Sequence, residues 1–358
     1  MNDRLLAAIC ARYGLGVPTA PPAAVSGGRL HRVWKLTTTS GDYAVKRLSP
    51  VRSGYATAAR GGGPWTVTEL AAAALAESGI PAVAALWGPD GPVSAVAGAR
   101  VLVYPWMAGA TAGPEAAPPD RARQVGALLG RIHAARLDLE ALESRLPERA
   151  DGAEWDTRDF ALPWELDAQR DDGWVLLARR GIAAGAPWGE PLRDLRRSIA
   201  LWAARARQAL PRLYRTQVFG HRDLNQQNVL WRAPTDPAII DWEYAGMVHP
   251  TVELADVALN WSGITLGPPD GDAFAAVVAG YREGGGTIQA EGRDALYVAL
   301  WSWLDWVRYM APRSLGDGAA TDEERAIATS ETLKTLGAVR TLGEQVDLWA
   351  SRLERGGQ

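Results

Sequence analysis

Cysteine, lysine and histidine are scarce in this sequence. The scarcity of cysteine excludes some classes of site, and the scarcity of lysine makes each remaining lysine informative. Cys10 is the only cysteine, which excludes an intrachain disulfide and a cysteine-rich metal site. Lysine occurs only at Lys35, Lys46 and Lys334, because arginine fills nearly all the other basic positions. A lysine that is retained at a motif position is therefore informative.

Long apolar runs and an excess of positive charge are also missing. The longest early apolar run, residues 5–11, is too short to span a membrane, and it follows Asp3 and Arg4 rather than a basic leader. The formal net charge is −3 and the pI is near 5.9, whereas a nucleic-acid-binding domain usually has a basic face and a high pI. We therefore expect a cytoplasmic protein that binds neither membrane nor nucleic acid.

The length of the chain predicts two lobes or domains. The chain has 358 residues, more than the roughly 250–300 at which a single hydrophobic core stops growing. Its hydrophobic content of 47% and charged content of 22% are ordinary for a globular protein. The sequence shows no recurring period of the kind that indicates a solenoid.

Residues 218–246 carry the densest set of candidate catalytic side chains. The pattern His221-x-Asp223-x-x-x-x-Asn228 is followed by an apolar triplet, a turn, and a second apolar run that ends in Asp241. The two apolar runs predict short strands, so the polar residues lie on a loop and at a strand end. A surface turn in which Asp and Asn cap backbone groups is the alternative, but it explains neither the strands nor Asp241.

Phosphoryl transfer uses these residue types in this order. It needs a carboxylate that orients and deprotonates the attacking hydroxyl, and oxygen ligands that hold Mg²⁺ against the phosphates of ATP. Asp223 fits the first task, and Asn228 and Asp241 fit the second as metal ligands. We therefore assign Asp223 and His221 to the catalytic loop, with the histidine as its brace.

The same order of residues, ending in Asp241-Trp242-Glu243, resembles the aminoglycoside phosphotransferases and choline kinases. The resemblance implies an α+β, two-lobed protein-kinase-like fold, with a small β-sheet N-lobe at 1–104 and a mainly helical C-lobe at 105–358. It also implies ATP and Mg²⁺ as cofactors and transfer of the γ-phosphoryl group to a hydroxyl of a small molecule. Glu243 is assigned to binding of this acceptor.

The resemblance also assigns nucleotide contacts near the N-terminus. Alternating residues on both sides of Ser40-Gly41-Asp42 predict a β-hairpin, whose second strand carries Lys46. The run Tyr43-Ala-Val-Lys46 is similar to the kinase pattern Val-Ala-Ile-Lys, so Lys46 would bind the α- and β-phosphates, unless it is a solvent-facing strand lysine. Gly27 and Gly28 would form the loop whose backbone N–H groups approach the phosphates.

A helix and a strand complete the predicted nucleotide site. The helical pattern at 65–77 places Glu69 where related kinases have the glutamate that holds the strand lysine, and an exposed helix glutamate is the alternative. Residues 100–109 predict an edge strand that runs into the hinge. Val103, Tyr104 and Trp106 on this segment are the candidates for contact with adenine.

Apolar spacing predicts that helices fill the C-lobe. We expect them over 119–145, 191–213, 273–283, 290–310 and 321–353, with an irregular insertion over 147–189. His133 lies on the first of these helices, where a structural role is expected. Helical spacing favours Trp303 and Trp306 as core residues over a ligand stack.

The insertion contains an acidic segment that predicts the charge of the acceptor. Residues 151–172 carry eight acidic side chains and only two arginines, so they would attract a cationic acceptor such as an aminoglycoside or amino sugar. Trp155, Asp156 and Asp159 are assigned to acceptor binding, because aromatic faces beside carboxylates suit ammonium groups. A solvated loop that serves solubility alone is the alternative.

Two other functions remain open from the sequence. The enzyme would use the same chemistry on Ser or Thr of a peptide, and a nucleotide-binding module without catalysis would use the same nucleotide contacts. The sequence sets neither the identity of the acceptor, the choice between ATP and GTP, nor the oligomeric state.

Overall fold

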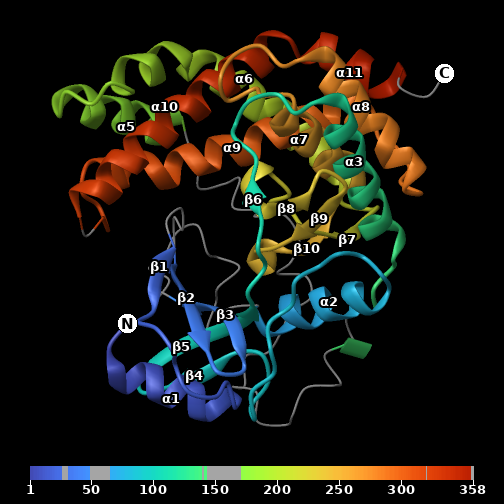
Figure 1. Cartoon of the computed structure of the whole chain (residues 1–358). Helices are drawn as coiled ribbons and strands as arrows, with labels where there is room; N and C mark the ends of the chain where they lie inside the picture. The colour runs from blue at the N-terminus through green and yellow to red at the C-terminus, as the bar shows by residue number, and fades with distance from the viewer. Residues whose placement is uncertain (26–30, 49–64, 139–140, 143–170, 320, 356–358) are drawn as a thin grey trace.

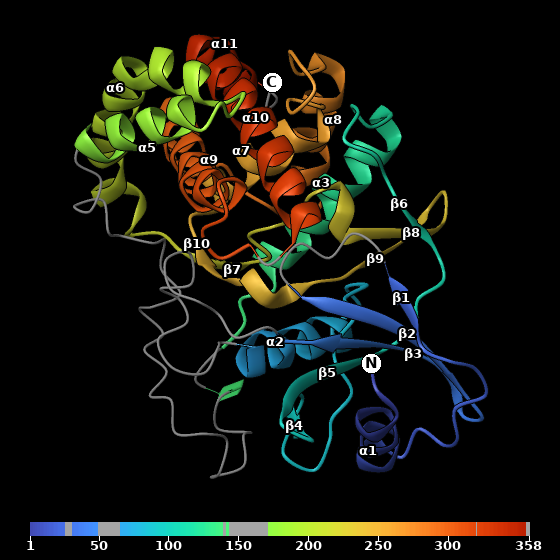
Figure 2. The ribbon, with the colours of Figure 1, turned by 90° about the vertical axis from the view of Figure 1, so that its left-hand side faces the viewer.

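The computed structural model describes residues 1–25, 31–48, 65–138, 141–142, 171–319 and 321–355. Within them, the first sheet belongs to the N-terminal part and helices dominate the C-terminal part, so the fold is α+β (Figure 1). Figure 2 shows the first sheet and helix α1 on one side of the molecule and the bundle of later helices on the other. No helix in the described ranges has both the length and the apolar character needed to cross a membrane.

Five strands form the antiparallel sheet of the N-lobe, in the order β1-β2-β3-β5-β4. They are β1 (Ala23–Val25), β2 (Arg32–Thr38), β3 (Gly41–Arg47), β4 (Ser94–Val96) and β5 (Ala99–Pro105). The predicted hairpin is β2–β3, and Thr38 pairs with Gly41 at its turn. The prediction of an edge strand at β5 was wrong, because β5 pairs with β3 on one side and with β4 on the other.

The alternation of side chains along β3 fixes where Lys46 lies. Val45 is fully buried in a core shared with Val103 of β5 and with residues of α1 (Asp3–Tyr13). Lys46 points to the opposite face, on which its register partner Leu102 packs with Trp65 of α2 (Trp65–Glu77). The strand therefore delivers the lysine to the side of the sheet that meets the C-lobe.

In the C-lobe, α9 contacts α6, α7, α10 and α11, whereas α3 and α8 pack against each other and against α7 (Figure 1). The helices are α3 (Pro119–Ala134), α5 (Asp171–Ala183), α6 (Gly189–Leu213), α7 (Pro250–Trp261), α8 (Gly271–Glu283), α9 (Gly292–Ser314), α10 (Asp322–Glu344) and α11 (Val346–Arg355). Trp303 of α9 packs against the core as expected, and its indole nitrogen donates to Asp256 Oδ1 at 2.5 Å.

Three predicted boundaries in this lobe were wrong. Helix α3 ends at Ala134 rather than near residue 145, because Arg136 adopts a left-handed backbone with φ of 45°. Helix α5 lies in the segment expected to be irregular, and its Leu177 and Ala178 enter the core. The single helix expected over 321–353 is α10 and α11, which are separated at Gln345.

Glycines allow α3 and α8 to pack with their backbones in contact. A Cβ on Gly126 would lie 2.0 Å from the carbonyl oxygen of Val277, and one on Gly280 would lie 1.9 Å from that of Arg123. No larger residue fits at either position without separating the helices. This close packing places His133 of α3 beside Tyr281 of α8.

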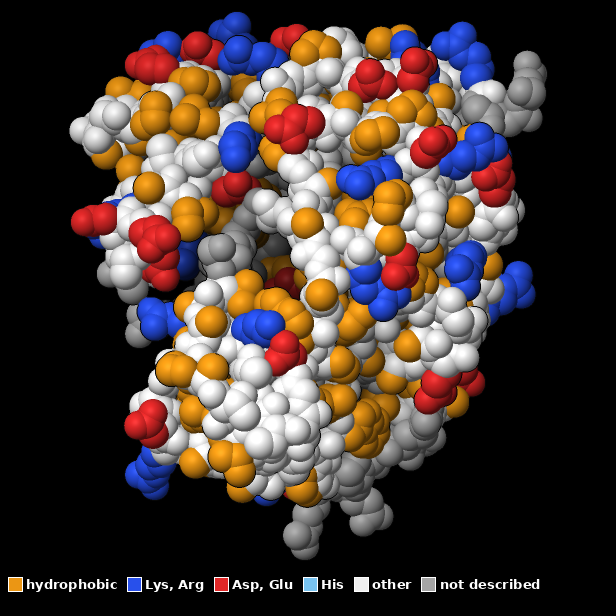
Figure 3. All heavy atoms as spheres, in the orientation of Figure 1, with side chains coloured by type: hydrophobic (Ala, Val, Ile, Leu, Met, Phe, Trp, Pro, Cys, Tyr) orange, Lys and Arg blue, Asp and Glu red, His pale blue; other side chains and the backbone are white. Residues whose placement is uncertain are grey.

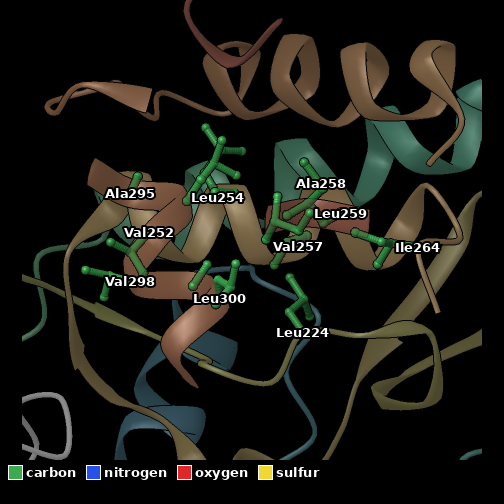
Figure 4. Close-up of a cluster of buried hydrophobic side chains, with 14 of the residues drawn as sticks. Leu224, Val252, Leu254, Val257, Ala258, Leu259, Ile264, Ala295, Val298 and Leu300 are labelled. Atoms are coloured by element: carbon green, nitrogen blue, oxygen red, sulfur yellow. The ribbon is translucent and has the colours of Figure 1, made fainter. Parts of the chain in front are cut away.

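A buried apolar cluster supports the segment that carries the candidate catalytic residues. Leu224 of that segment is 1% exposed and belongs to the same core as Val257 of α7 and Leu300 of α9. Figure 4 shows Leu224 pointing toward these helices. Because the core is close-packed, the loop above it is held in one position.

Candidate active site

Short strands of the C-lobe frame the candidate catalytic loop, as predicted. The loop at 221–228 leaves β7, passes through the 3₁₀ turn η4, and continues directly into β8. β7 pairs with β10, and β8 lies between β6 and β9. The elements are β6 (Ala110–Thr111), β7 (Val218–Gly220), η4 (Gln226–Asn228), β8 (Val229–Ala233), β9 (Asp236–Ile239), η5 (Trp242–Tyr244) and β10 (Gly246–Val248).

The carboxylate of Asp223 is oriented by two neighbouring amides. Asn228 Nδ2 donates to the carbonyl oxygen and to Oδ2 of Asp223, both at 2.8 Å. Asn225 Nδ2 donates to Oδ1 of Asp223 at 2.6 Å, and its own Oδ1 accepts from the backbone of Gln227 to begin η4. Neutral donors therefore fix both oxygens of a carboxylate that stays partly exposed.

Glu253 of α7 holds the backbone at the start of the loop. Its Oε1 accepts from the backbone N–H of Arg222 at 2.5 Å, where the chain adopts a left-handed φ of 62°. Its Oε2 lies 2.9 Å from Nε2 of His133, whose other ring nitrogen contacts the Tyr281 hydroxyl. Burial alone would raise the pKa of the Glu253 carboxyl, but the hydrogen bond and charge of His133 outweigh it and lower that pKa. The contacts of His133 agree with the structural role expected for it.

His221 connects the catalytic loop to the segment that delivers Asp241. The side chain is fully buried, and Nε2 donates to the carbonyl oxygen of Ile240 at 3.0 Å. Its ring lies 4.6 Å from that of Trp242. Burial lowers the pKa of the imidazole, so the ring is neutral near pH 7. These contacts are those of a brace.

Hydrogen bonds continue from the loop to the N-lobe lysine. The backbone N–H of Ile240 donates to the carbonyl of Asn228 at 3.0 Å, and the next residue, Asp241, has a left-handed φ of 64°. Oδ1 of Asp241 lies 2.6 Å from Nζ of Lys46. The structure therefore brings Asp223, Asn228, Asp241 and Lys46 together.

Lys46 is buried between two carboxylates. It is 7% exposed, which excludes the solvent-facing alternative, and its Nζ lies 2.6 Å from Oε2 of Glu243 as well as from Asp241. Burial by itself would lower the pKa of the ammonium group, but the charges of Asp241 and Glu243 outweigh it and raise the pKa. Glu243, which we expected to contact the acceptor, contacts Lys46 and His31 instead.

Glu69 is also buried, at 2% exposure, but its contacts differ from those predicted. Its Oε1 accepts from the Tyr104 hydroxyl at 2.6 Å and its Oε2 accepts from the backbone N–H of Ala85 at 2.8 Å. Burial raises the pKa of the Glu69 carboxyl to about 7, against the lowering effect of these two hydrogen bonds. The contact with Lys46 that the resemblance implies for Glu69 is not among the contacts of these described residues.

The backbone of the predicted hinge already makes internal contacts. The Val103 carbonyl accepts from Leu86, and the Trp106 N–H donates to the Asp42 carbonyl. The side chain of Val103 is fully buried on the α1 face, and the Trp106 ring lies 5.0 Å from the Lys35 ammonium. Contact of these residues with adenine stays a prediction.

Some predicted site residues lie outside the described ranges. They are Gly27 and Gly28 of the phosphate loop, and Trp155, Asp156 and Asp159 of the acidic segment. Among the described residues, Figure 3 shows a hollow between the two lobes with an acidic side chain inside it.

Sequence reasoning missed two residues of this site. Asn225 stands inside the motif and had a signal, because an amide two residues after Asp223 can reach its carboxylate in a turn. His31, whose Nε2 lies 3.0 Å from Glu243 Oε2, had no signal beyond the scarcity of histidine, since only the fold brings it to Glu243.

Solved structures with a similar fold include several phosphotransferases. A spectinomycin phosphotransferase in complex with ADP and spectinomycin has a TM-score of 0.68 at 12% identity, over 96% of this chain and 99% of its own. A macrolide 2′-phosphotransferase from Brachybacterium faecium has a TM-score of 0.51 at 20% identity, over 90% and 96%. A choline kinase from Cryptosporidium parvum has a TM-score of 0.53 at 12% identity, over 99% of each chain. No curated protein sequence matches the chain.

The chain has the fold of the protein-kinase-like phosphotransferases. The model of the phosphotransferase enzyme family matches residues 23–296, and the chain belongs to this family. The predicted class, an ATP-dependent phosphotransferase that acts on a hydroxyl group of a small molecule, is thereby confirmed.

Proposed function

We propose that Asp223 is the base through which this enzyme moves the γ-phosphoryl group of ATP to a small-molecule hydroxyl. The observation that carries this assignment is the geometry of its carboxylate, which Asn225 and Asn228 hold by both oxygens while it stays partly exposed. A general base must reach the proton that it takes, and an oriented carboxylate at an open site meets this condition. His221, buried and neutral, acts by holding the loop.

The oxygen atoms next to Asp223 fit Mg²⁺. Two hydrogen bonds from Asn228 Nδ2 to Asp223 leave Oδ1 of that amide available to a cation, and the Asp241 side chain is 36% exposed. No cluster of three or more His, Cys, Asp or Glu side chains in the described ranges is arranged to hold a metal alone. Mg²⁺ is usually bound by one or two carboxylates together with substrate phosphates, which suits this donor set.

We assign Asn228 and Asp241 as ligands of the ion, whose chemistry would be to neutralise charge on the phosphates. Lys46 would bind the α- and β-phosphates, for which its ammonium group stays charged between its carboxylates. Gly27, Gly28, Tyr104 and Trp106 remain the proposed contacts to the rest of the nucleotide, whereas the side chain of Val103 is buried on the opposite, α1 face of the sheet.

We propose a cationic acceptor, such as an aminoglycoside or amino sugar, because of the acidic composition of residues 151–172. ATP as the donor suits the cytoplasmic location expected from the sequence. Transfer to Ser or Thr of a peptide is the second candidate, since the same base and phosphate contacts would serve it.

The proposal is tested by incubating the enzyme with Mg·ATP and a panel of acceptors. The panel contains spectinomycin, a macrolide, choline, a free amino sugar and a Ser/Thr peptide library, with Asp223→Asn as the matched control. We expect one small molecule to gain the mass of a phosphoryl group with the wild type only. Phosphorylation of peptides alone would favour the second candidate, and ATP binding without turnover on any acceptor would indicate a non-catalytic module.

A further inference from the structure

The phosphate-binding lysine has an unexpected partner in this fold. Nζ of Lys46 lies 2.6 Å from Oε2 of Glu243, and both side chains are 9% exposed. Glu243 belongs to η5, two residues after Asp241, so the carboxylate comes from the C-lobe. The glutamate of α2, Glu69, is directed elsewhere.

Glu69 is held by donors that it cannot leave without cost. Its two oxygens accept from the Tyr104 hydroxyl and the Ala85 N–H, both in a buried environment. A buried donor that loses its acceptor costs about 1–3 kcal/mol. A move of Glu69 to Lys46 would leave both donors without that acceptor, and it would release Tyr104 at the start of the hinge.

Glu243, in contrast, is held beside Lys46 by a second contact. Its Oε2 also lies 3.0 Å from Nε2 of His31, the residue just before β2, and the two side chains are 9% and 7% exposed. The His31 ring meets the Trp65 ring of α2 edge to face at 6.0 Å. Glu243 is therefore fixed by two N-lobe side chains, one of which is anchored on α2.

The other carboxylate on Lys46 has a competing task. Asp241 is 36% exposed and is our proposed ligand of Mg²⁺, so the ion would share this carboxylate with the lysine. Glu243 is buried and is not a proposed ligand of the ion, so its contact to Lys46 does not compete with Mg²⁺. Resting on the proposed function, we propose that Glu243, and not Glu69, is the positioning residue that aims Lys46 at the ATP phosphates, whereas Glu69 supports Tyr104.

Two double-mutant cycles on nucleotide affinity test this inference without an acceptor. Binding of Mg·ATP is measured by calorimetry for Lys46→Met, Glu243→Gln, Glu69→Gln and the two double variants with Lys46→Met. We expect Glu243→Gln to weaken binding about tenfold in the wild-type background and hardly at all in the Lys46→Met background. Glu69→Gln acts through Tyr104 and not through Lys46, so it should change affinity by the same factor in both backgrounds.

The reverse pattern, with Glu69 coupled to Lys46 and Glu243 additive, would overturn the inference. His31→Gln gives a second route if Glu243→Gln folds poorly: it should weaken Mg·ATP binding in the wild-type background and hardly at all in the Lys46→Met background. A wild type that binds no ATP would contradict the proposed function itself, so the two failures are distinguishable. With an acceptor identified, Glu243→Gln should raise KM for ATP more than it lowers kcat.

Discussion

The side-chain amide of Asn228 spans two oxygens of Asp223, the backbone carbonyl and Oδ2, with both contacts at 2.8 Å. The proposed base and a proposed metal ligand are thus one hydrogen-bonded unit. Removal of the amide should disturb both tasks, and variants of Asn228 can separate them.

Asn228→Asp keeps an oxygen for Mg²⁺ but loses both donors and sets a like charge beside Asp223. We expect kcat to fall by about 10²-fold, the typical contribution of a general base, while the Mg²⁺ dependence of nucleotide binding is retained. Asn228→Ala should lose both, and a Mg²⁺ titration of ATP affinity distinguishes the variants. The same Mg²⁺ dependence in Asn228→Ala as in the wild type would remove Asn228 from the metal site.

Asp241→Asn is the suited variant for the second proposed ligand, because asparagine tolerates the left-handed backbone of Asp241, with its φ of 64°. With Mg²⁺ present, ATP at 100 times its Kd should stabilise the wild type by about 2.7 kcal/mol and the variant far less. Thermal unfolding with Mg²⁺ or with a chelator measures this difference. Equal stabilisation of both proteins by Mg·ATP would count against Asp241 as a ligand.

Gly220→Ala should displace the carboxylate that holds the catalytic loop. A Cβ there would lie 1.8 Å from Oε2 of Glu253 and 2.6 Å from Cγ1 of Val248. We expect a loss of about 1–3 kcal/mol in unfolding free energy and a lower kcat, because the Arg222 N–H loses its acceptor. Gly337→Ala, where no atom lies within 4 Å of the new Cβ, is the control and should gain about 0.5–1 kcal/mol. An unchanged kcat in Gly220→Ala would show that the position of Glu253 does not affect the catalytic loop.

The Glu69 carboxyl makes stability depend on pH in a defined direction. Its pKa is raised from 4.5 to about 7 in the folded protein, so between these pH values the folded state binds more protons than the unfolded state. Stability from this group is present at low pH and is lost as pH rises through about 7. Relative to the wild type, Glu69→Gln should therefore gain up to about 3 kcal/mol between pH 5 and pH 8. A pH-independent difference in denaturant unfolding would contradict the burial-driven shift.

Local sequence patterns correctly predicted the helix and strands that hold the candidate site residues. The hairpin with Lys46, helix α2 and the strands around Asp223 follow from alternation, helical spacing and turn residues, which act over a few neighbours. Helix α5 was missed because the acidic composition before it obscured the spacing of Leu177 and Ala178. The interior position of β5 was missed because β4 is only a three-residue strand, with little pattern of its own.

The partners within the site could not be predicted in the same way. Glu243 meets Lys46 across 197 positions in sequence, and Glu69 meets Tyr104 across 35. Such pairs depend on which buried donors and acceptors the folded backbone brings together. The spacing of residues along the sequence does not predict these long-range contacts. The order of Asp223, Asn228 and Asp241 was predictable because one continuous segment carries all three residues.

Turnover by Asp223→Asn tests the central claim most directly. The substitution keeps the size of the side chain but removes the carboxylate that takes the proton of the acceptor hydroxyl. With an acceptor from the panel, kcat should fall by about 10² to 10⁴, while the Kd for Mg·ATP and the thermal stability stay close to those of the wild type. Wild-type kcat in this variant would show that Asp223 is not the base.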